Sequence, residues 1–224
     1  MDIPLLGKNA RVSDKKIAGL HFLNVVRVVW LREILIYFRD RPRVISAFMM
    51  PIVMLILFGE GLGGIIELPG ISYRQFIFPG MVAMIVLMNS IFAGVTIVTD
   101  RQFGFLREML VAPVSRTAIA VAKIFGGATI ALINGVVLFA FAPLMGIDIS
   151  FLIVVKLMGL ILLVGFMLTG IGVSIGSRLR TPESFQMLSQ AIIFPAMFLS
   201  GVFFPVNNTA KWLDFFVQFN PITY

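Results

Sequence analysis

The chain has no cysteine and only one histidine, His21, among its 224 residues. The absence of cysteine excludes a disulfide framework, a thiolate metal site and a cysteine nucleophile. The phosphate-binding pattern GxxxxGK[ST] and the zinc motif HExxH are also missing. We therefore expect no catalytic residue, no metal site and no bound cofactor in this chain.

Charge is scarce as well. Asp, Glu, Lys and Arg make up 13% of the residues, and four stretches of more than twenty residues contain none of them: 76–99, 124–147, 157–177 and 184–210. About 20 apolar residues cross the hydrocarbon of a bilayer, whereas a soluble core does not need such long stretches. The sequence thus predicts an all-α fold, a polytopic transmembrane helical bundle.

Five spans are expected within one membrane domain that covers residues 44–224. They lie at about 44–62, 76–99, 118–141, 152–177 and 187–204. The first span is the weakest, because Glu60 interrupts it and Pro51 should kink it. Ser115 or Thr117 is expected to cap the third span.

The sequence also suggests a helix-packing site in the fourth span and a short helix after the fifth. Gly172 and Gly176 form a small-xxx-small pair suited to close helix packing. Residues 211–219 should form a short amphipathic helix at the outer interface. Its aromatic residues fit a belt anchor or a role in gating.

The segment before the first span is less apolar. Within residues 22–38, eleven Leu, Ile, Val and Phe residues favour insertion by about 3–7 kcal/mol, and two arginines oppose it by about 5–7 kcal/mol before Glu33 is counted. The sum does not favour spanning. We expect residues 22–43 to form an amphipathic helix in the cytoplasmic interface, after a polar cytoplasmic lead at 1–21.

Basic residues are unequally divided between the two sides of the spans. Nine of the 18 precede the first span, and Lys123 is expected to snorkel from the third span to the same side. The loop residues on that side include Arg101, Arg107, Arg116, Arg178 and Arg180. This bias predicts a multi-pass protein of the cytoplasmic (inner) membrane with a cytoplasmic N-terminus. The excess of basic residues faces anionic lipid, so no nucleic-acid partner is expected.

Ionisable residues in the middle of a span usually mark proton or ion pathways. The second to fifth spans have none near their centres. We expect no buried cluster of acids, bases or nucleophiles, which argues against a proton-coupled carrier and an intramembrane enzyme. The energy for any transport must then come from elsewhere.

The loop at residues 100–117 is the main functional candidate. Phe103, Leu106, Met109 and Leu110 recur at three- and four-residue spacing and form one apolar stripe. Pro113 ends this element. A short amphipathic cytoplasmic helix can lie on lipid or dock in a partner's groove, and the pattern alone leaves both open.

Within that loop, Gly104-Phe-Leu-Arg-Glu-Met-Leu-Val-Ala-Pro-Val-Ser-Arg116 resembles type-two ABC exporter permeases of the daunorubicin-resistance and nodulation-factor export group. Phe-Pro-Gly at 78–80, Ser-Gly-Val-Phe-Phe-Pro at 200–205 and Asn-Pro-Ile-Thr-Tyr at 220–224 are similar to further patterns of the group. The resemblance covers nearly the whole chain in order. Members of the group have six spans, and this sequence ends where a sixth is expected to begin.

The resemblance implies a permease subunit that works with a separate cytoplasmic ABC ATPase, which binds ATP and Mg. Two permease copies, as a homodimer or heterodimer, and two ATPases would form one exporter. The interfacial helix and the loop would contact the ATPase. The matched loop positions are Gly104, Leu106, Arg107, Pro113, Ser115 and Arg116, and the amphipathic pattern adds Phe103, Glu108, Met109 and Leu110.

Residues that contact a substrate are harder to identify. A possible path comprises Met84, Met88, Asn89 and Ser90 of the second span and Glu60 of the first. Hydrogen bonds between helices are the favoured alternative role of Asn89 and Ser90, and an acid at the outer end of a span is most often solvated.

The function expected is ATP-driven export of an amphipathic drug, lipid or lipid-linked glycan. The alternative is a non-transporting membrane anchor or assembly subunit that docks a cytoplasmic partner.

Overall fold

The described part of the chain consists of helices and contains no strand. The computed structural model describes residues 6–61, 72–105, 111, 114–145 and 150–200. Its elements are α1 (Leu6–Arg39), α2 (Arg41–Gly61), α3 (Tyr73–Phe92), α4 (Val95–Gln102), α6 (Arg116–Phe139), the 3-10 helix η1 (Ala142–Met145), α7 (Phe151–Arg178) and α8 (Pro182–Leu199).

Four stretches in these helices are long and apolar enough to cross a bilayer. They are Arg41–Gly59, Gln75–Gln102, Arg116–Phe139 and Leu152–Arg178. The expectation of an all-α, polytopic bundle is confirmed. Of the fifth expected span, α8 contains residues 187–199, whereas residues 201–204 and the expected outer helix at 211–219 lie outside the described residues.

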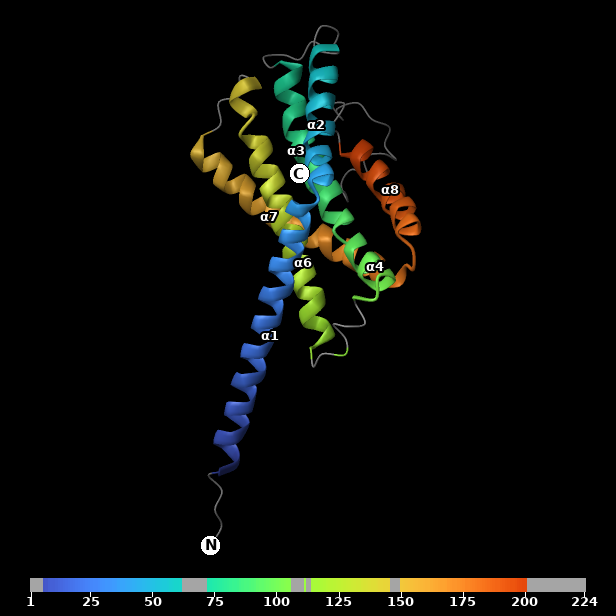
Figure 1. The fold of residues 1–224 in the computed structure, drawn as a ribbon. Helices are drawn as coiled ribbons and strands as arrows, with labels where there is room; N and C mark the ends of the chain where they lie inside the picture. The colour runs from blue at the N-terminus through green and yellow to red at the C-terminus, as the bar shows by residue number, and fades with distance from the viewer. Residues whose placement is uncertain (1–5, 62–71, 106–110, 112–113, 146–149, 201–224) are drawn as a thin grey trace, which may run out of the picture.

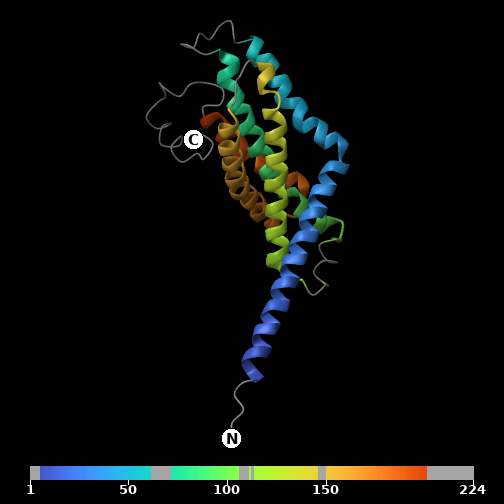
Figure 2. The same cartoon turned by 90° about the vertical axis from the view of Figure 1, so that its left-hand side faces the viewer.

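α1 is a continuous helix of 34 residues that begins within the expected polar lead. Its first half extends away from the other helices, and its second half lies along α6 (Figure 1). Pro42 explains the end of α1, because proline fits the first turn of a helix but not its interior. The Asp40 carboxylate accepts a hydrogen bond from the Arg43 backbone N–H at 3.3 Å. α2 then leaves in a different direction from α1 (Figure 2).

The second apolar stretch, expected as a span at about 76–99, consists of two helices, α3 and α4. Ser72 and Gln75 form a reciprocal capping box at the start of α3. The helix breaks after Phe92, where the Gly94 N–H bonds to Ile91 O, three residues back instead of four. α4 then continues to Gln102.

Contact with α7 accounts for this break. A Cβ added at Gly94 would come within 2.9 Å of Val173 N and closer still to the Gly172 carbonyl. A Cβ at Gly172 would lie 3.1 Å from Ile91 Cα, and one at Gly176 would collide with Gly94 O. Backbone therefore packs directly on backbone here, as small residues permit between membrane helices.

The remaining helices begin at caps that their sequences provide. Ser115 Oγ accepts the Ala118 N–H at 3.2 Å, which confirms the expected cap of the third span. Thr181 Oγ1 accepts the Ser184 N–H at 3.2 Å, and Pro182 occupies the first position of α8. η1, which contains Pro143, follows the end of α6.

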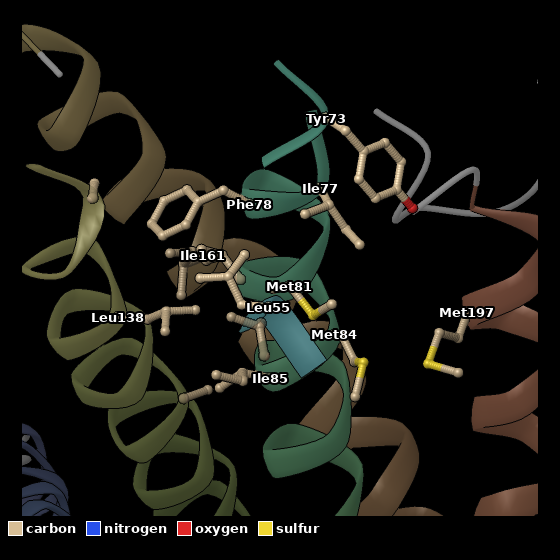
Figure 3. Packing of buried hydrophobic residues seen from close by; sticks show 14 residues of the cluster. Leu55, Tyr73, Ile77, Phe78, Met81, Met84, Ile85, Leu138, Ile161 and Met197 are labelled. Atoms are coloured by element: carbon tan, nitrogen blue, oxygen red, sulfur yellow. The ribbon is translucent and has the colours of Figure 1, made fainter. Parts of the chain in front are cut away.

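α3 forms the centre of the bundle and packs on α2, α6, α7 and α8. The buried side chains labelled in Figure 3 come mainly from α3, with one each from α2, α6, α7 and α8: Leu55, Tyr73, Ile77, Phe78, Met81, Met84, Ile85, Leu138, Ile161 and Met197. Lipid tails are as apolar as these side chains, so tight van der Waals packing, more than water exclusion, holds such helices together. α2 and α7, in contrast, are mostly exposed.

Candidate functional site

Four charged side chains from three helices meet where α1 passes α4 and the first turns of α6. Lys123 Nζ of α6 lies 2.7 Å from Glu33 Oε1 of α1 and 2.7 Å from Asp100 Oδ2 of α4. Arg32 of α1 completes the group, with Nη2 2.9 Å from Asp100 Oδ1 and Nη1 3.3 Å from Glu33 Oε1. We call these four residues the ion tetrad.

The ion tetrad is largely buried and balanced in charge. The side chain of Lys123 is 1% exposed, that of Glu33 6% and that of Asp100 10%. Lys123 also donates to Thr96 Oγ1 at 2.9 Å, so each of its three N–H donors has an acceptor. Gly126 leaves the space that Glu33 occupies, because a Cβ there would lie 2.9 Å from Glu33 Cβ. Buried charges are tolerated in such paired arrangements.

The position of Lys123 corrects two expectations. Its ammonium does not snorkel toward solvent but points into the bundle, where two carboxylates bind it. The expectation that the chain buries no cluster of acids and bases is also wrong. The reason is that Lys123 lies 90 residues from Glu33 and 23 from Asp100, so no local pattern connects them. The signal available in the sequence was Lys123 inside an otherwise apolar stretch of the third span and Glu33 as the one acid within residues 22–38.

The arrangement has no evident catalytic chemistry. Every acid in the tetrad is paired with a cation, so none is free to act as a base. Within the described residues, no three His, Asp or Glu side chains gather in a way that could hold a metal ion. The tetrad instead joins three helices by fixed charges.

The candidate loop begins directly beside the tetrad. The Arg32 guanidinium lies 3.8 Å above the ring of Phe105, a cation–π contact. Gly104 adopts φ 79°, a left-handed conformation that glycine permits. Phe103 is 85% exposed and Val111 87%, so no described residue covers these two apolar side chains.

The other predicted loop residues divide into two groups. Ser115 and Arg116 are exposed at the start of α6. Six others lie outside the described residues: Leu106, Arg107, Glu108, Met109, Leu110 and Pro113. The structure therefore places only the two ends of the predicted docking face.

Arg101, next to Asp100 in α4, connects to a different neighbour. Its guanidinium donates to Ser177 O at 2.7 Å and to Leu179 O at 2.9 Å, at the C-terminal end of α7. Unpaired carbonyls there carry partial negative charge, which a cation stabilises. Two consecutive residues of α4 thus connect to opposite neighbours, Asp100 to α1 and α6 and Arg101 to α7.

α1 is held to α6 at two further points. Trp30 Nε1 donates to Thr129 Oγ1 at 3.1 Å, and the Tyr37 hydroxyl donates to Asn134 Oδ1 at 2.9 Å. Burial raises the pKa of Tyr37, which keeps the phenol protonated as the donor. With Glu33, these residues recur at three- and four-residue spacing along α1, so one stripe of the helix carries all three links.

The residues of the predicted substrate path lie in different surroundings. Met84 is 5% exposed and Ser90 is fully buried, while Met88 and Asn89 are half-buried. Asn89 Nδ2 donates to Ile85 O within its own helix at 3.0 Å. The side chain of Glu60 is not among those described. In this conformation the α3 residues face the protein core more than an open passage.

Comparison with known proteins gives a consistent result. Residues 24–224 match the family described as ABC-2 type transporter. Over 97% of its length the chain is 28% identical to the putative transport permease ycf38 of Cyanophora paradoxa and spans 79% of that protein. No solved structure matches the chain.

Two bacterial proteins are also similar. Over 81% of its length the chain is 24% identical to the daunorubicin resistance ABC transporter permease protein DrrB1 of Streptomyces coeruleorubidus, and it spans 65% of that protein. Over 70% of its length it is 26% identical to the probable multidrug ABC transporter permease YbhR of Escherichia coli, of which it spans 43%.

Proposed function

Because the chain belongs to the ABC-2 type transporter family, we propose that it exports an amphipathic drug, lipid or lipid-linked glycan. It is a transmembrane permease subunit of an ABC transporter, and ATP hydrolysis belongs to a separate subunit. The named functions of two relatives, daunorubicin resistance and multidrug transport, support the choice of an amphipathic cargo.

The ATPase is proposed to dock on the segment from Phe103 to Arg116. The observation that carries this proposal is the exposure of Phe103 and Val111, two apolar side chains flanking the amphipathic stretch. The expected docking face comprises Phe103, Gly104, Leu106, Arg107, Glu108, Met109, Leu110, Pro113, Ser115 and Arg116. An apolar stripe with a charged rim suits a groove on a cytoplasmic partner.

The remaining expectations complete the proposal. The protein resides in the cytoplasmic membrane with its N-terminus inside, which the unequal distribution of basic residues supports. A second permease copy completes the passage, and the largely exposed faces of α2 and α7 leave room for a copy or for lipid. Met84, Met88, Asn89, Ser90 and Glu60 remain candidate contacts for the cargo.

The docking proposal is tested by purification of the full chain from its native membrane in mild detergent. Mass spectrometry is expected to find an ABC ATPase in equal amount with the wild type and to find little with Glu108→Arg. The reason is that reversing one rim charge places like charges across the interface. Glu183→Arg is the matched control, because Glu183 is exposed at the start of α8, outside the docking segment.

The outcomes separate the candidate functions. An ATPase that remains bound to Glu108→Arg would contradict the docking site. If the complex hydrolyses ATP but the rate responds neither to a panel of membrane lipids nor to daunorubicin, the chain is an anchoring subunit. If no ATPase co-purifies with the wild type, the export proposal itself fails.

A further inference from the structure

The ion tetrad connects the parts of the chain that come directly before and after the docking segment, Phe103 to Arg116. Asp100 precedes the segment by three residues and Lys123 follows its end by seven, and their side chains meet at 2.7 Å. One buried ion pair therefore holds together α4, which leads into the docking segment, and α6, which follows it. A partner that pulls on the segment pulls on this pair.

α1 is bound to α4 and α6 at the same place through its two residues of the tetrad. Glu33 binds Lys123, and Arg32 binds Asp100 while its guanidinium covers Phe105. Arg32 thus touches both the tetrad and the first residues of the docking segment. Displacement of Phe105 by a docked partner necessarily alters the surroundings of Arg32.

α4 is suited to move as a unit at this place. It is separated from α3 by the break at Ala93 and Gly94, where the regular hydrogen-bond pattern is interrupted. Its far end carries Asp100 in the tetrad and Arg101 on the carbonyls of α7. Movement of α4 about the break would therefore displace its contacts with α1, α6 and α7 together.

The energetics of the tetrad point to a role other than stability. Removing charges from water carries a large desolvation penalty, and well-packed apolar residues are often as stabilising as a buried ion pair. Charges that must all remain paired do, however, restrict the helices to discrete arrangements, which is how a small local shift becomes a larger one.

We propose that the ion tetrad is the joint that transmits movement of the docking segment to α1, α4 and α6. The inference rests on the proposed function, since it supposes a docked ATPase. Arg32, Glu33, Asp100 and Lys123 are then positioning residues of the transport cycle. They contact neither nucleotide nor cargo.

The test uses the full chain in complex with its co-purified ATPase. The chain has no cysteine, so Met50→Cys and Leu163→Cys provide two unique sites for spin labels. Both positions are exposed, at 49% in α2 and 67% in α7, and both lie outside the tetrad. Mixing labelled with cysteine-free copies keeps one labelled chain per complex. The label separation is measured without nucleotide and with MgATP and vanadate.

The informative variant is Glu33→Gln with Lys123→Met, which removes one charge of each sign and leaves Arg32 and Asp100 paired. Lys156→Met with Glu183→Gln is the matched control, because it makes the same two changes at exposed positions. In wild type and control, MgATP is expected to shift the label separation. In the tetrad variant the ATPase rate should stay within about twofold of wild type while the shift is lost, because the ATPase is then uncoupled from the spans.

Two results would overturn the inference while leaving the proposed function intact. A shift that persists in the tetrad variant shows that the movement travels by another route. Loss of the ATPase activity together with the shift assigns the tetrad to folding or assembly alone. A wild-type complex without any nucleotide-dependent shift would instead defeat the proposed function, and the inference with it.

Discussion

Lys123 shows how completely the surroundings of one residue can determine its role. A lysine near the end of a span usually extends its long chain to the interface. Here the ammonium finds three acceptors inside the bundle, on α1 and α4. Its removal would leave Glu33 and Asp100 facing one another, with Arg32 as their common counter-charge.

Lys123→Met is therefore expected to destabilise the protein by about 3–5 kcal/mol, the usual effect of deleting one partner of a buried ion pair. Adding Glu33→Gln should recover most of that loss, since the remaining Arg32 and Asp100 balance each other. Unfolding in mixed detergent micelles gives the measurement. Lys156→Met, at an exposed site of α7, is the control and should change little. Equal stability of the two single variants would contradict the buried pairing.

At the scale of elements, the contact between the α3–α4 break and α7 determines how the bundle packs. Three glycines, Gly94, Gly172 and Gly176, let the two backbones approach. The small-xxx-small spacing in α7 was visible in the sequence. The break itself was not, because residues 76–99 are uniformly apolar and nothing in their pattern marks Gly94 as a partner of Gly172.

Gly94→Ala and Gly172→Ala are each expected to lower the stability by about 1–3 kcal/mol, because a new methyl group would overlap backbone atoms that cannot move aside. Gly159→Ala in the same helix is the matched control. A Cβ at Gly159 meets no atom within 4 Å, so this change should be neutral or slightly stabilising. Thermal unfolding in detergent distinguishes them, and similar midpoints for all three variants would speak against the close approach.

At the scale of the whole molecule, the hydropathy pattern and the capping residues were enough to predict the fold class and one helix start. The apolar stretches and Ser115 predicted an all-α bundle with a capped third span, as found. The tetrad escaped prediction, because its partners come from helices separated by 23 to 90 residues and lie on no common sequence period. α1 also begins earlier than expected. Local sequence patterns predict where helices form, whereas the contacts between helices become visible only in the three-dimensional structure.

The proposed orientation makes a prediction of its own. Ser150→Cys, before α7, should react with a membrane-impermeant maleimide on intact cells that produce the full chain, whereas Arg180→Cys, after α7, should react only once the membrane is permeabilised. Both side chains are exposed, and Ser150 Oγ makes no capping bond that the change would remove. The cysteine-free parent is the control. The reverse labelling pattern would place the N-terminus outside.

The 90 residues between Glu33 and Lys123 also impose an order on biosynthesis. A ribosome adds about 5–20 residues per second, so several seconds pass after α1 emerges before its counter-ion exists. During that interval Arg32 and Glu33 have only each other as ionic partners, without Asp100 or Lys123, and incompletely paired charges are poorly tolerated in hydrocarbon. We therefore expect α1 to stay at the aqueous boundary while α2 and α3 insert, and to pack against α6 only once α6 has been synthesised. The ion pairs of the tetrad therefore form late in the synthesis and folding of the protein.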